Sequence, residues 1–379
     1  MPTKFDSIRP YDDADLSVVL SKLFNNKEFI NSIVAFKFSA WPRFIHPFLG
    51  FITRRYIIKQ IAHIETLRGF QRLIEPYIER MINTTTESFS VSGLDKLDLS
   101  QACLFMSNHR DIALDPTFVN WALHLNGQDT VRIAVGDNLL KKEWVADLIR
   151  LNKCFIVKRS ATDRREKLSA AKLLSEYIEF TLINEQQHIW IAQREGRAKD
   201  GNDVTNPAIV SMLALNKPKD VEFSEYIRNL RIVPVSISYE FDPCDINKAK
   251  ELQKVEREGS YDKPDNEDVR SIVNGITGKK GRVHIHFGGV LTGEYSNAKE
   301  VAGQIDQEIL QGYNSFSTGP VALSMLSSED NSIDNDDLLS DPYCKAAYDY
   351  LQERLGNLSA AEQNKLLNMY ACAHIRKSS

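Results

Sequence analysis

The sequence predicts an α/β protein with a largely parallel central sheet flanked by helices, with N-terminal amphipathic helices and a C-terminal helical extension. From about residue 88 onward, short apolar runs of strand length alternate with longer amphipathic segments. This alternation is typical of a parallel sheet covered by helices on both faces. The 379 residues suffice for one large domain with additions or for two domains. We expect N-terminal helices over residues 1–87, an α/β domain over 88–295 and a helical extension over 296–379.

The composition argues against several classes of protein. The formal net charge is −4, whereas a dedicated nucleic-acid binder is usually strongly basic. The five cysteines are scattered without a Cys-x-x-Cys pair, which is typical of a reduced compartment and predicts no zinc site. The polar N-terminus lacks the pattern of a signal peptide, and no apolar run reaches the length of a membrane-spanning helix. We expect a cytoplasmic protein, without nucleic acid as a partner, that associates peripherally with the inner face of a membrane.

Residues 29–58 mix aromatic, aliphatic and cationic side chains. One interpretation is a pair of helices that lies in a membrane interface, with its apolar face in the acyl boundary. The alternative is a helical layer that covers the core of the same protein, because apolar periodicity does not distinguish lipid from protein. The apolar side chains of this region include Trp41, Phe44, Phe48, Phe51 and Ile52.

Hydrophobic period and turn residues place the other elements. Helices are expected at residues 15–24, 60–84, 115–124, 138–149, 163–184, 296–312 and 342–375, and strands at 89–94, 102–106, 131–135, 154–157, 188–192, 231–238 and 281–289. The charged residues 242–268 predict an exposed helical insertion, and the polar residues near 327–341 predict a linker. His284 and His286 share one face of the last strand, where we expect solvent rather than a metal, because no third ligand is nearby in the sequence.

The stretch 105–117 contains the main candidate for chemistry. His109 stands where a strand ends and a helix begins, which is where open α/β sheets place their sites. Asp115 lies six positions later, so one turn can return its carboxylate to the imidazole. Such a carboxylate would fix the tautomer and leave the other ring nitrogen as a general base. Asp111 is the competing partner.

Cations follow two further predicted strands. Lys158 and Arg159 come directly after residues 154–157, and a polar loop with Glu195, Gly196 and Arg197 follows residues 188–192. Guanidinium groups and loop amides of this kind suit a phosphate group. The alternative at each position is an ordinary turn or a solvated surface. It is weakened because three strand ends carry compatible chemistry.

Four segments stand in a fixed order along the chain. They are Asn108-His109-Arg110 with Asp115, Phe155-Ile156-Val157-Lys158-Arg159, Glu195-Gly196-Arg197 and Ile232-Val233-Pro234-Val235. Together they resemble the ordered motifs of the glycerolipid acyltransferase superfamily, over about residues 88–291. Two departures from the family pattern stand out. Five residues separate His109 from Asp115 where the family has four, and Arg197 follows Gly196 directly where the family has one residue between.

The resemblance implies an enzyme that acylates glycerol 3-phosphate or lysophosphatidate. His109 would be the general base and Asp115 its orienting carboxylate. A glycerol hydroxyl would attack the carbonyl of a fatty acyl thioester without a covalent acyl-enzyme, and amides at the helix start would stabilise the oxyanion. The implied substrate-binding residues are Arg159, Arg197, Lys158 and Arg110 for the phosphate, and Glu195 and Gly196 for the acceptor pocket.

The resemblance requires no metal and no cofactor beyond the co-substrate, an acyl-coenzyme A or acyl carrier protein thioester. The implied partners are the lipid precursor, the thioester and a membrane surface. Two alternatives stay open. One is a catalytically silent phospholipid-binding module, motivated by the longer spacing from His109 to Asp115. The other is a metal-dependent phosphate-ester hydrolase that uses His109, Asp111 and Asp115.

Overall fold

The computed structural model describes residues 4–38, 42, 45–264, 266–328, 331–333 and 336–378. Its contacts divide the chain into two compact units. The first comprises Met1–Arg80 and Arg132–Tyr177, and the second comprises Met81–Val131 and Ile178–Ser379. The domain boundaries predicted near residues 87 and 295 were based on the sequence pattern and not on contacts. They remain a prediction.

The second unit is built on strands in the order β1-β7-β6-β2-β5. They are β1 (Thr86–Ser92), β2 (Leu104–Ser107), β5 (Ile189–Ala192), β6 (Ile232–Tyr239) and β7 (Gly281–Phe287). β1 pairs with β7 in parallel, β2 pairs in parallel with both β5 and β6, and β6 runs antiparallel to β7. The predicted α/β fold with a largely parallel sheet is confirmed.

The strands in the middle of this order are buried on both faces. Every residue of β2 and of β6 is buried, which explains their nearly continuous apolar sequences. Because β2 runs parallel to β5 and β6, the carboxyl ends of these three strands lie at one edge of the sheet. His109 follows β2 at that edge, and residues 193–201 follow β5 there.

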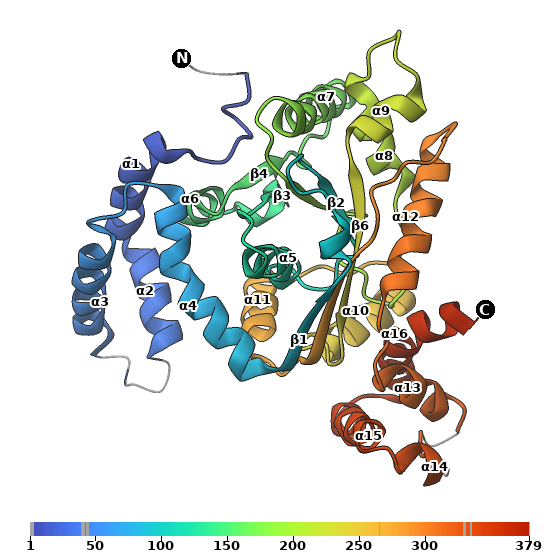
Figure 1. Ribbon diagram of the computed structural model, residues 1–379. Helices are drawn as coiled ribbons and strands as arrows, with labels where there is room; N and C mark the ends of the chain where they lie inside the picture. Colours follow the sequence, from blue (N-terminus) through green and yellow to red (C-terminus); the bar gives the residue numbers. More distant parts are fainter. Residues whose placement is uncertain are drawn as a thin grey trace. The chain divides into compact units, whose positions relative to one another are not determined.

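Helices cover both faces of these strands. Figure 1 shows α5 on one face of β2 and β6 and α12 on the other. The C-terminal helices α13, α15 and α16 share an apolar core, to which Ala249 of α10 also contributes. The helix predicted over residues 342–375 is two helices, because α15 ends before Gly356 and α16 begins at Ala360. The bounds are α5 (Leu114–Leu125), α8 (Pro207–Leu213), α9 (Phe223–Asn229), α10 (Asp245–Glu258), α11 (Glu267–Thr277), α12 (Ala298–Gly312), α13 (Thr318–Leu326), α14 (Asp336–Leu339), α15 (Pro342–Leu355) and α16 (Ala360–Ser378).

The prediction of an exposed insertion over residues 242–268 is wrong for its first part. In α10, Asp245 and Lys248 are buried. Asp245 forms an ion pair with Arg354 of α15, and Lys248 forms one with Asp242. Charged side chains can be buried when each is paired, and here one of the partners comes from a distant part of the chain.

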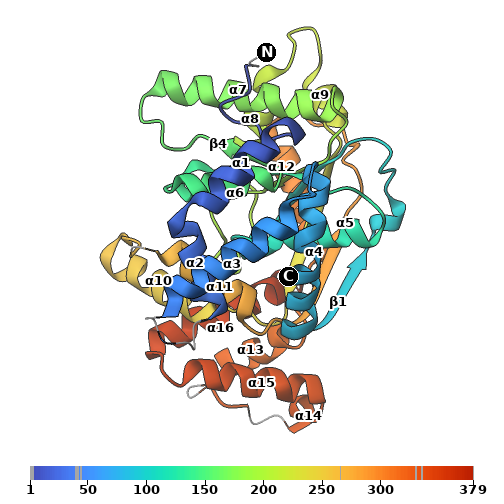
Figure 2. The ribbon, with the colours of Figure 1, turned by 90° about the vertical axis from the view of Figure 1, so that its left-hand side faces the viewer.

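The first unit contains α1 (Asp13–Asn25), α2 (Lys27–Lys37), α3 (His46–Ile61), α6 (Glu143–Leu151), β3 (Arg132–Gly136) and β4 (Cys154–Val157). β3 and β4 pair in parallel. α1, α2 and α3 lie beside one another, as Figure 2 shows. Two further helices, α4 (Leu67–Thr85) and α7 (Arg164–Ile183), continue from this unit into the second.

Each interpretation of residues 29–58 fits one of the two helices in that region. Phe29 and Val34 of α2 are buried in the core of the first unit, as a covering layer requires. On α3, by contrast, Phe48 is 67% exposed, Phe51 57% and Ile52 46%. No helix among the described residues is both long and apolar enough to cross a bilayer. Two aromatic residues of the region, Trp41 and Phe44, lie outside the described residues.

Candidate active site

The loop between β2 and α5 is fixed to the sheet by the side chain of Asn108. Its Oδ1 accepts a hydrogen bond from the amide of Ile237 at 2.8 Å, and its Nδ2 donates to the carbonyl of Ile237 at 2.9 Å. The side chain thereby continues the pairing of β2 with β6 beyond the last strand residue. Ser107 adds a second anchor, because its hydroxyl accepts a hydrogen bond from Trp190 Nε1 at 3.0 Å.

His109 and Asp115 are in direct contact. The distance from His109 Nδ1 to Asp115 Oδ2 is 2.8 Å. A carboxylate accepts hydrogen bonds, so Nδ1 carries the proton and Nε2 has its lone pair available. The histidine side chain is 15% exposed and the aspartate is fully buried. The ring of Trp190 packs edge-on against the imidazole at 5.7 Å between centroids.

Asp115 accepts further hydrogen bonds that explain how the longer spacing is accommodated. The amides of Arg110 and Asp111 donate to Oδ2 at 2.6 and 2.9 Å, so the loop wraps around the carboxylate. The hydroxyl of Tyr239, at the end of β6, donates to Oδ1 at 2.7 Å. The extra residue therefore widens the loop without separating Asp115 from His109.

Asp111, the competing partner, faces the start of α5 instead. Its Oδ1 accepts hydrogen bonds from the amides of Ala113 and Leu114 at 2.9 and 2.8 Å, which forms an aspartate turn directly before the helix. Burial raises the pKa of Asp111, and the neighbouring charge of Asp115 adds to this. The structure brings Asp115, and not Asp111, to the imidazole.

The expectation that amides at the helix start stabilise an oxyanion is not supported by this geometry. The amides of residues 110 and 111 donate to Asp115, and those of residues 113 and 114 donate to Asp111. A donor that already serves a buried carboxylate is not available to a substrate oxygen without loss of that bond.

Arg110 does not join the site as the resemblance implied. The residue is 5% exposed, and its guanidinium forms an ion pair with Asp203 at 2.6 Å. The guanidinium also lies over the ring of Tyr313 at 5.3 Å. Burial disfavours the charged form, but Asp203, Tyr313 and Asp242 together outweigh this and raise the pKa of Arg110. Because its charge is compensated internally, we exclude Arg110 from the phosphate-binding residues proposed below.

The loop after β5 reaches the histidine through its backbone. The amide of Ala198 donates to the carbonyl of His109 at 2.9 Å. Arg197, directly before it, has a buried Nη1 without a hydrogen-bond partner, while its Nη2 lies 3.4 Å from the hydroxyl of Ser271. Gly196 has a φ of +72°, which a side chain would disfavour, and Glu195 is exposed. The loop thus holds a cation with one unmatched donor next to the segment that carries His109.

Lys158 and Arg159 lie in the first unit, directly after β4, and both are exposed. Asp137 shapes this turn, because its carboxylate accepts hydrogen bonds from the amides of Arg159 and Ser160 at 3.1 and 3.2 Å. Gly136 lies beside the turn, where a Cβ would come within 3.0 Å of Arg159 Nε. The glycine therefore leaves room for this guanidinium.

His284 and His286 do not simply face solvent, because hydrogen bonds join them to β1. Ser90 Oγ lies 2.8 Å from His284 Nδ1, and Ser92 Oγ lies 3.0 Å from His284 Nε2 and 2.8 Å from His286 Nδ1. Burial lowers the pKa of both histidines. Within the described ranges, no group of three or more His, Cys, Asp or Glu side chains is placed to hold a metal ion.

Sequence reasoning missed two residues that hold the histidine loop, Tyr239 and Lys248. Lys248 Nζ donates to the carbonyl of Arg110 at 2.8 Å. Tyr239 could have been noticed as a tyrosine at the end of a predicted strand, whereas Lys248 lay in the segment predicted to be exposed.

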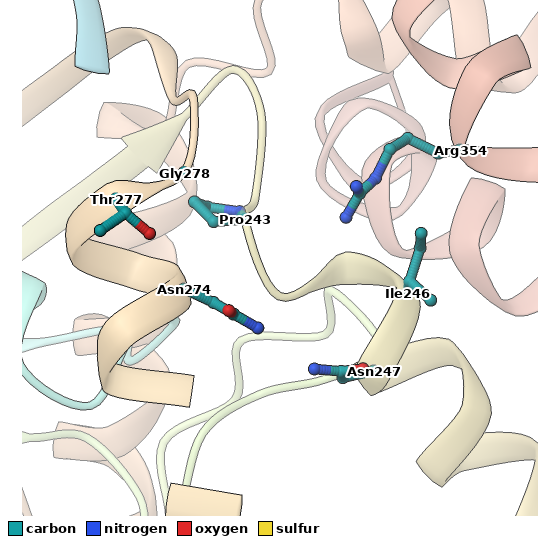
Figure 3. Close-up of a pocket in the computed structure, with 7 residues that line it drawn as sticks. All are labelled: Pro243, Ile246, Asn247, Asn274, Thr277, Gly278 and Arg354. Atoms are coloured by element: carbon teal, nitrogen blue, oxygen red, sulfur yellow. The ribbon is translucent and has the colours of Figure 1, made fainter. Parts of the chain in front are cut away.

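A pocket of about 290 Å³ contains neither His109 nor Asp115 (Figure 3). It is lined by Pro243, Ile246, Asn247, Asn274, Thr277, Gly278 and Arg354.

Comparisons with known proteins give one family match and one structural likeness. Residues 88–238 match the family model described as Acyltransferase, and this range includes His109, Asp115, Arg159 and Arg197. The chain also resembles the crystal structure of the 1-acyl-sn-glycerophosphate (LPA) acyltransferase PlsC from Thermotoga maritima, at 12% sequence identity and a TM-score of 0.39. That match covers 78% of this chain and 95% of the other. No curated protein matches the sequence.

Proposed function

We propose that this chain, whose residues 88–238 match the family model described as Acyltransferase, transfers a fatty acyl group from an acyl thioester to a hydroxyl of glycerol 3-phosphate or lysophosphatidate. The match to this family model supports acyl transfer as the reaction. The observation that carries the proposal is the contact of 2.8 Å between His109 and Asp115 inside the family segment. Because Asp115 occupies Nδ1, the other ring nitrogen can take a proton from the acceptor.

The chemistry follows from this arrangement. As the acceptor oxygen attacks the thioester carbonyl, its proton passes to His109 Nε2, and Asp115 stabilises the imidazolium that forms. The tetrahedral intermediate then breaks its carbon–sulfur bond and releases the thiol, which takes the proton back from Nε2. The products are an ester and a free thiol, and His109 returns to its neutral form. The donor is acyl-coenzyme A or an acyl carrier protein thioester.

Recognition of the acceptor phosphate is assigned to Arg197 of the second unit; for Arg159 and Lys158, which belong to the first unit, this role remains what the resemblance implies. Arg197 is the best supported of these, because its buried Nη1 has no hydrogen-bond partner and its loop binds the backbone of His109. A phosphate oxygen would satisfy that donor in a charge-assisted hydrogen bond. Glu195 and Gly196 shape the same loop and would border the acceptor.

The proposal is tested by comparing acceptors with and without the phosphate. Purified protein is given a labelled acyl thioester of either donor type, with glycerol 3-phosphate, glycerol, lysophosphatidate or a monoacylglycerol in separate reactions. We expect acyl transfer to a phosphorylated acceptor and at least about 10-fold less transfer to its unphosphorylated counterpart, the scale of a lost charged hydrogen bond. Equal transfer with and without the phosphate would exclude the proposed acceptor class.

Replacing Arg197 by alanine should raise the Michaelis constant for the acceptor by about 10-fold or more, because it removes a charged contact to a group remote from the reacting bond. The turnover number should change less. Steady-state kinetics with varied acceptor measures both. The resemblance alone implies the same direction for Arg159→Ala.

Lys199→Ala is the matched control for the arginine variants. Lys199 lies in the same loop, but its ammonium already forms an ion pair with Glu251. We expect its Michaelis constant for the acceptor to stay within about 2-fold of the wild-type value. An unchanged constant in Arg197→Ala, or an equal rise in Lys199→Ala, would remove Arg197 from the proposed site.

Contact with a membrane surface is proposed for α3. Its exposed apolar side chains stand beside cations, and a shallow hollow of about 740 Å³ there is lined by Ile52, Arg55, Tyr56, Ile58, Lys59 and Ala62. The guanidinium of Arg55 lies over the ring of Phe51 at 5.8 Å. Aromatic side chains next to cations are typical of helices that bind anionic lipid surfaces.

Replacing Phe48, Phe51 and Ile52 together by serine should weaken binding to anionic vesicles by at least about 10-fold, because three apolar side chains no longer enter the acyl boundary. Cosedimentation with vesicles that contain phosphatidylserine measures the effect. The folded state should be retained, since these side chains are already exposed.

A control triple variant uses exposed apolar residues of the second unit, Leu125, Val255 and Val269, replaced by serine. Its vesicle binding should equal that of the wild type. If both triple variants bind as the wild type does, α3 is not the membrane contact.

The silent-module alternative rested on the longer spacing between His109 and Asp115. The contact at 2.8 Å removes this motive, because the wider loop still presents the carboxylate to Nδ1. We therefore favour the catalytic proposal.

A further inference from the structure

Part of the support for the histidine–aspartate pair comes from just outside the segment that matches the family. That segment ends at residue 238. The next residue, Tyr239, is the last residue of β6 and donates its hydroxyl proton to Asp115 Oδ1 at 2.7 Å. Asp115 is fully buried and Tyr239 is 6% exposed, so neither group can exchange this bond for one with bulk water.

The two carboxylate oxygens of Asp115 accept hydrogen bonds from different donors. Oδ2 accepts from His109 and from the amides of Arg110 and Asp111. Oδ1 accepts from Tyr239. A hydrogen bond to Oδ1 fixes the rotation of the carboxylate about its Cβ–Cγ bond. It also draws negative charge away from Oδ2, which weakens the attraction of Asp115 for the imidazole proton.

The backbone of the loop is held by other groups. Lys248 of α10 donates to the carbonyl of Arg110 at 2.8 Å and is itself paired with Asp242. The Asn108 side chain binds the backbone of Ile237 with both of its polar atoms. Loss of the Tyr239 hydroxyl therefore leaves these anchors in place, and its consequence is confined to Asp115 and the histidine that it orients.

We propose that Tyr239 is a positioning residue for the His109–Asp115 pair, which fixes the carboxylate and tunes its pull on the imidazole proton. This inference rests on the proposed function of His109 as the base in acyl transfer. Tyr239 makes no contact with substrate in this account, because its hydroxyl is buried against Asp115. It acts through Asp115 alone.

Tyr239→Phe removes the hydroxyl and little else. We expect the turnover number to fall on the order of 10-fold, as for other groups that orient a reactive residue through one hydrogen bond, with an unchanged Michaelis constant for the acceptor. The acid limb of the pH profile of kcat/KM should move to higher pH, because Asp115 with one donor fewer attracts the imidazole proton more strongly. If Tyr239 only stabilised the fold, the acid limb of the pH profile would stay at the wild-type pH in Tyr239→Phe.

The matched control is Tyr350→Phe. Tyr350 also donates its hydroxyl to a buried aspartate, Asp245, at 3.1 Å, but has no contact with Asp115. Thermal unfolding of both variants measures the loss of stability from a missing tyrosine–aspartate hydrogen bond. The control should keep the wild-type turnover number and pH profile. If Tyr239→Phe also keeps both, or if the two variants lose activity equally, the proposal is overturned.

A second readout separates this inference from the proposed activity. One-bond nitrogen–proton NMR spectra of protein labelled at its eight histidines show the Nδ1 proton of His109, assigned by its disappearance in His109→Ala. In Tyr239→Phe this signal should shift downfield as the hydrogen bond to Asp115 strengthens, and in Tyr350→Phe it should stay in place. An unmoved signal in Tyr239→Phe overturns the proposal whether or not the protein transfers acyl groups. A shifted signal in a protein without acyl transfer instead contradicts the proposed function alone.

Discussion

Replacing His109 by alanine is expected to lower kcat/KM for acyl transfer by about 100- to 10,000-fold, the range of a lost general base. Nothing else among the described side chains offers an unprotonated nitrogen next to a buried carboxylate in this loop. We expect the variant to fold, because the histidine side chain is 15% exposed. Initial rates at saturating donor, with thermal unfolding measured in parallel, test this expectation.

His124→Ala is the control for this variant. His124 lies in α5, the helix that follows the loop, and packs against Trp121 at its exposed end. We expect its activity to remain within about 2-fold of the wild type, as for most surface changes. Retained transfer in a folded His109→Ala protein would exclude His109 as the base.

Asp115→Asn and Asp111→Asn should give very different results. The two carboxylate oxygens of Asp115 accept hydrogen bonds from four donors. An asparagine would place an NH₂ group, which is itself a donor, against at least one of these donors. We expect a loss of activity of about 100-fold or more, together with lower stability. The side-chain oxygen of an asparagine can accept the same two amide hydrogen bonds that Asp111 accepts, so Asp111→Asn should stay within a few-fold of the wild-type activity.

The same two assays, acyl transfer and thermal unfolding, measure both aspartate variants. An equal loss in the two, or a larger loss in Asp111→Asn, would mean that Asp111 rather than Asp115 orients the imidazole during the reaction.

The sequence predicted the strands well where an apolar run of strand length ends at a polar residue. Apolar runs that end at a polar residue placed β2, β4, β5 and β6 within two residues of their observed ends. This pattern is local, because a strand buried on both faces needs an unbroken apolar run. His109 could be identified for the same reason, since its position depends only on where β2 stops.

Contacts made across long sequence separations were not predictable. Tyr239 reaches Asp115 from 124 positions away, and Lys248 reaches the carbonyl of Arg110 from 138 positions away. The local hydrophobic periodicity of a sequence does not reveal contacts between residues this far apart. The charges of α10 suggested exposure because their partner Arg354 lies on a helix more than a hundred residues later. The contact of Arg110 with Asp203, which is 93 positions distant, could not be predicted for the same reason.

Acyl transfer by the purified wild-type protein, followed by the fate of the label, tests the account most directly. A labelled acyl thioester is incubated with glycerol 3-phosphate or lysophosphatidate, and the label is counted in lipid, in free fatty acid and on the protein. We expect label in the acylated phosphate lipid, one thiol released per ester formed, and no label on the protein when the acceptor is omitted. Absence of transfer to both acceptors from both donor types, or a labelled protein that passes its label to the acceptor, would contradict the account.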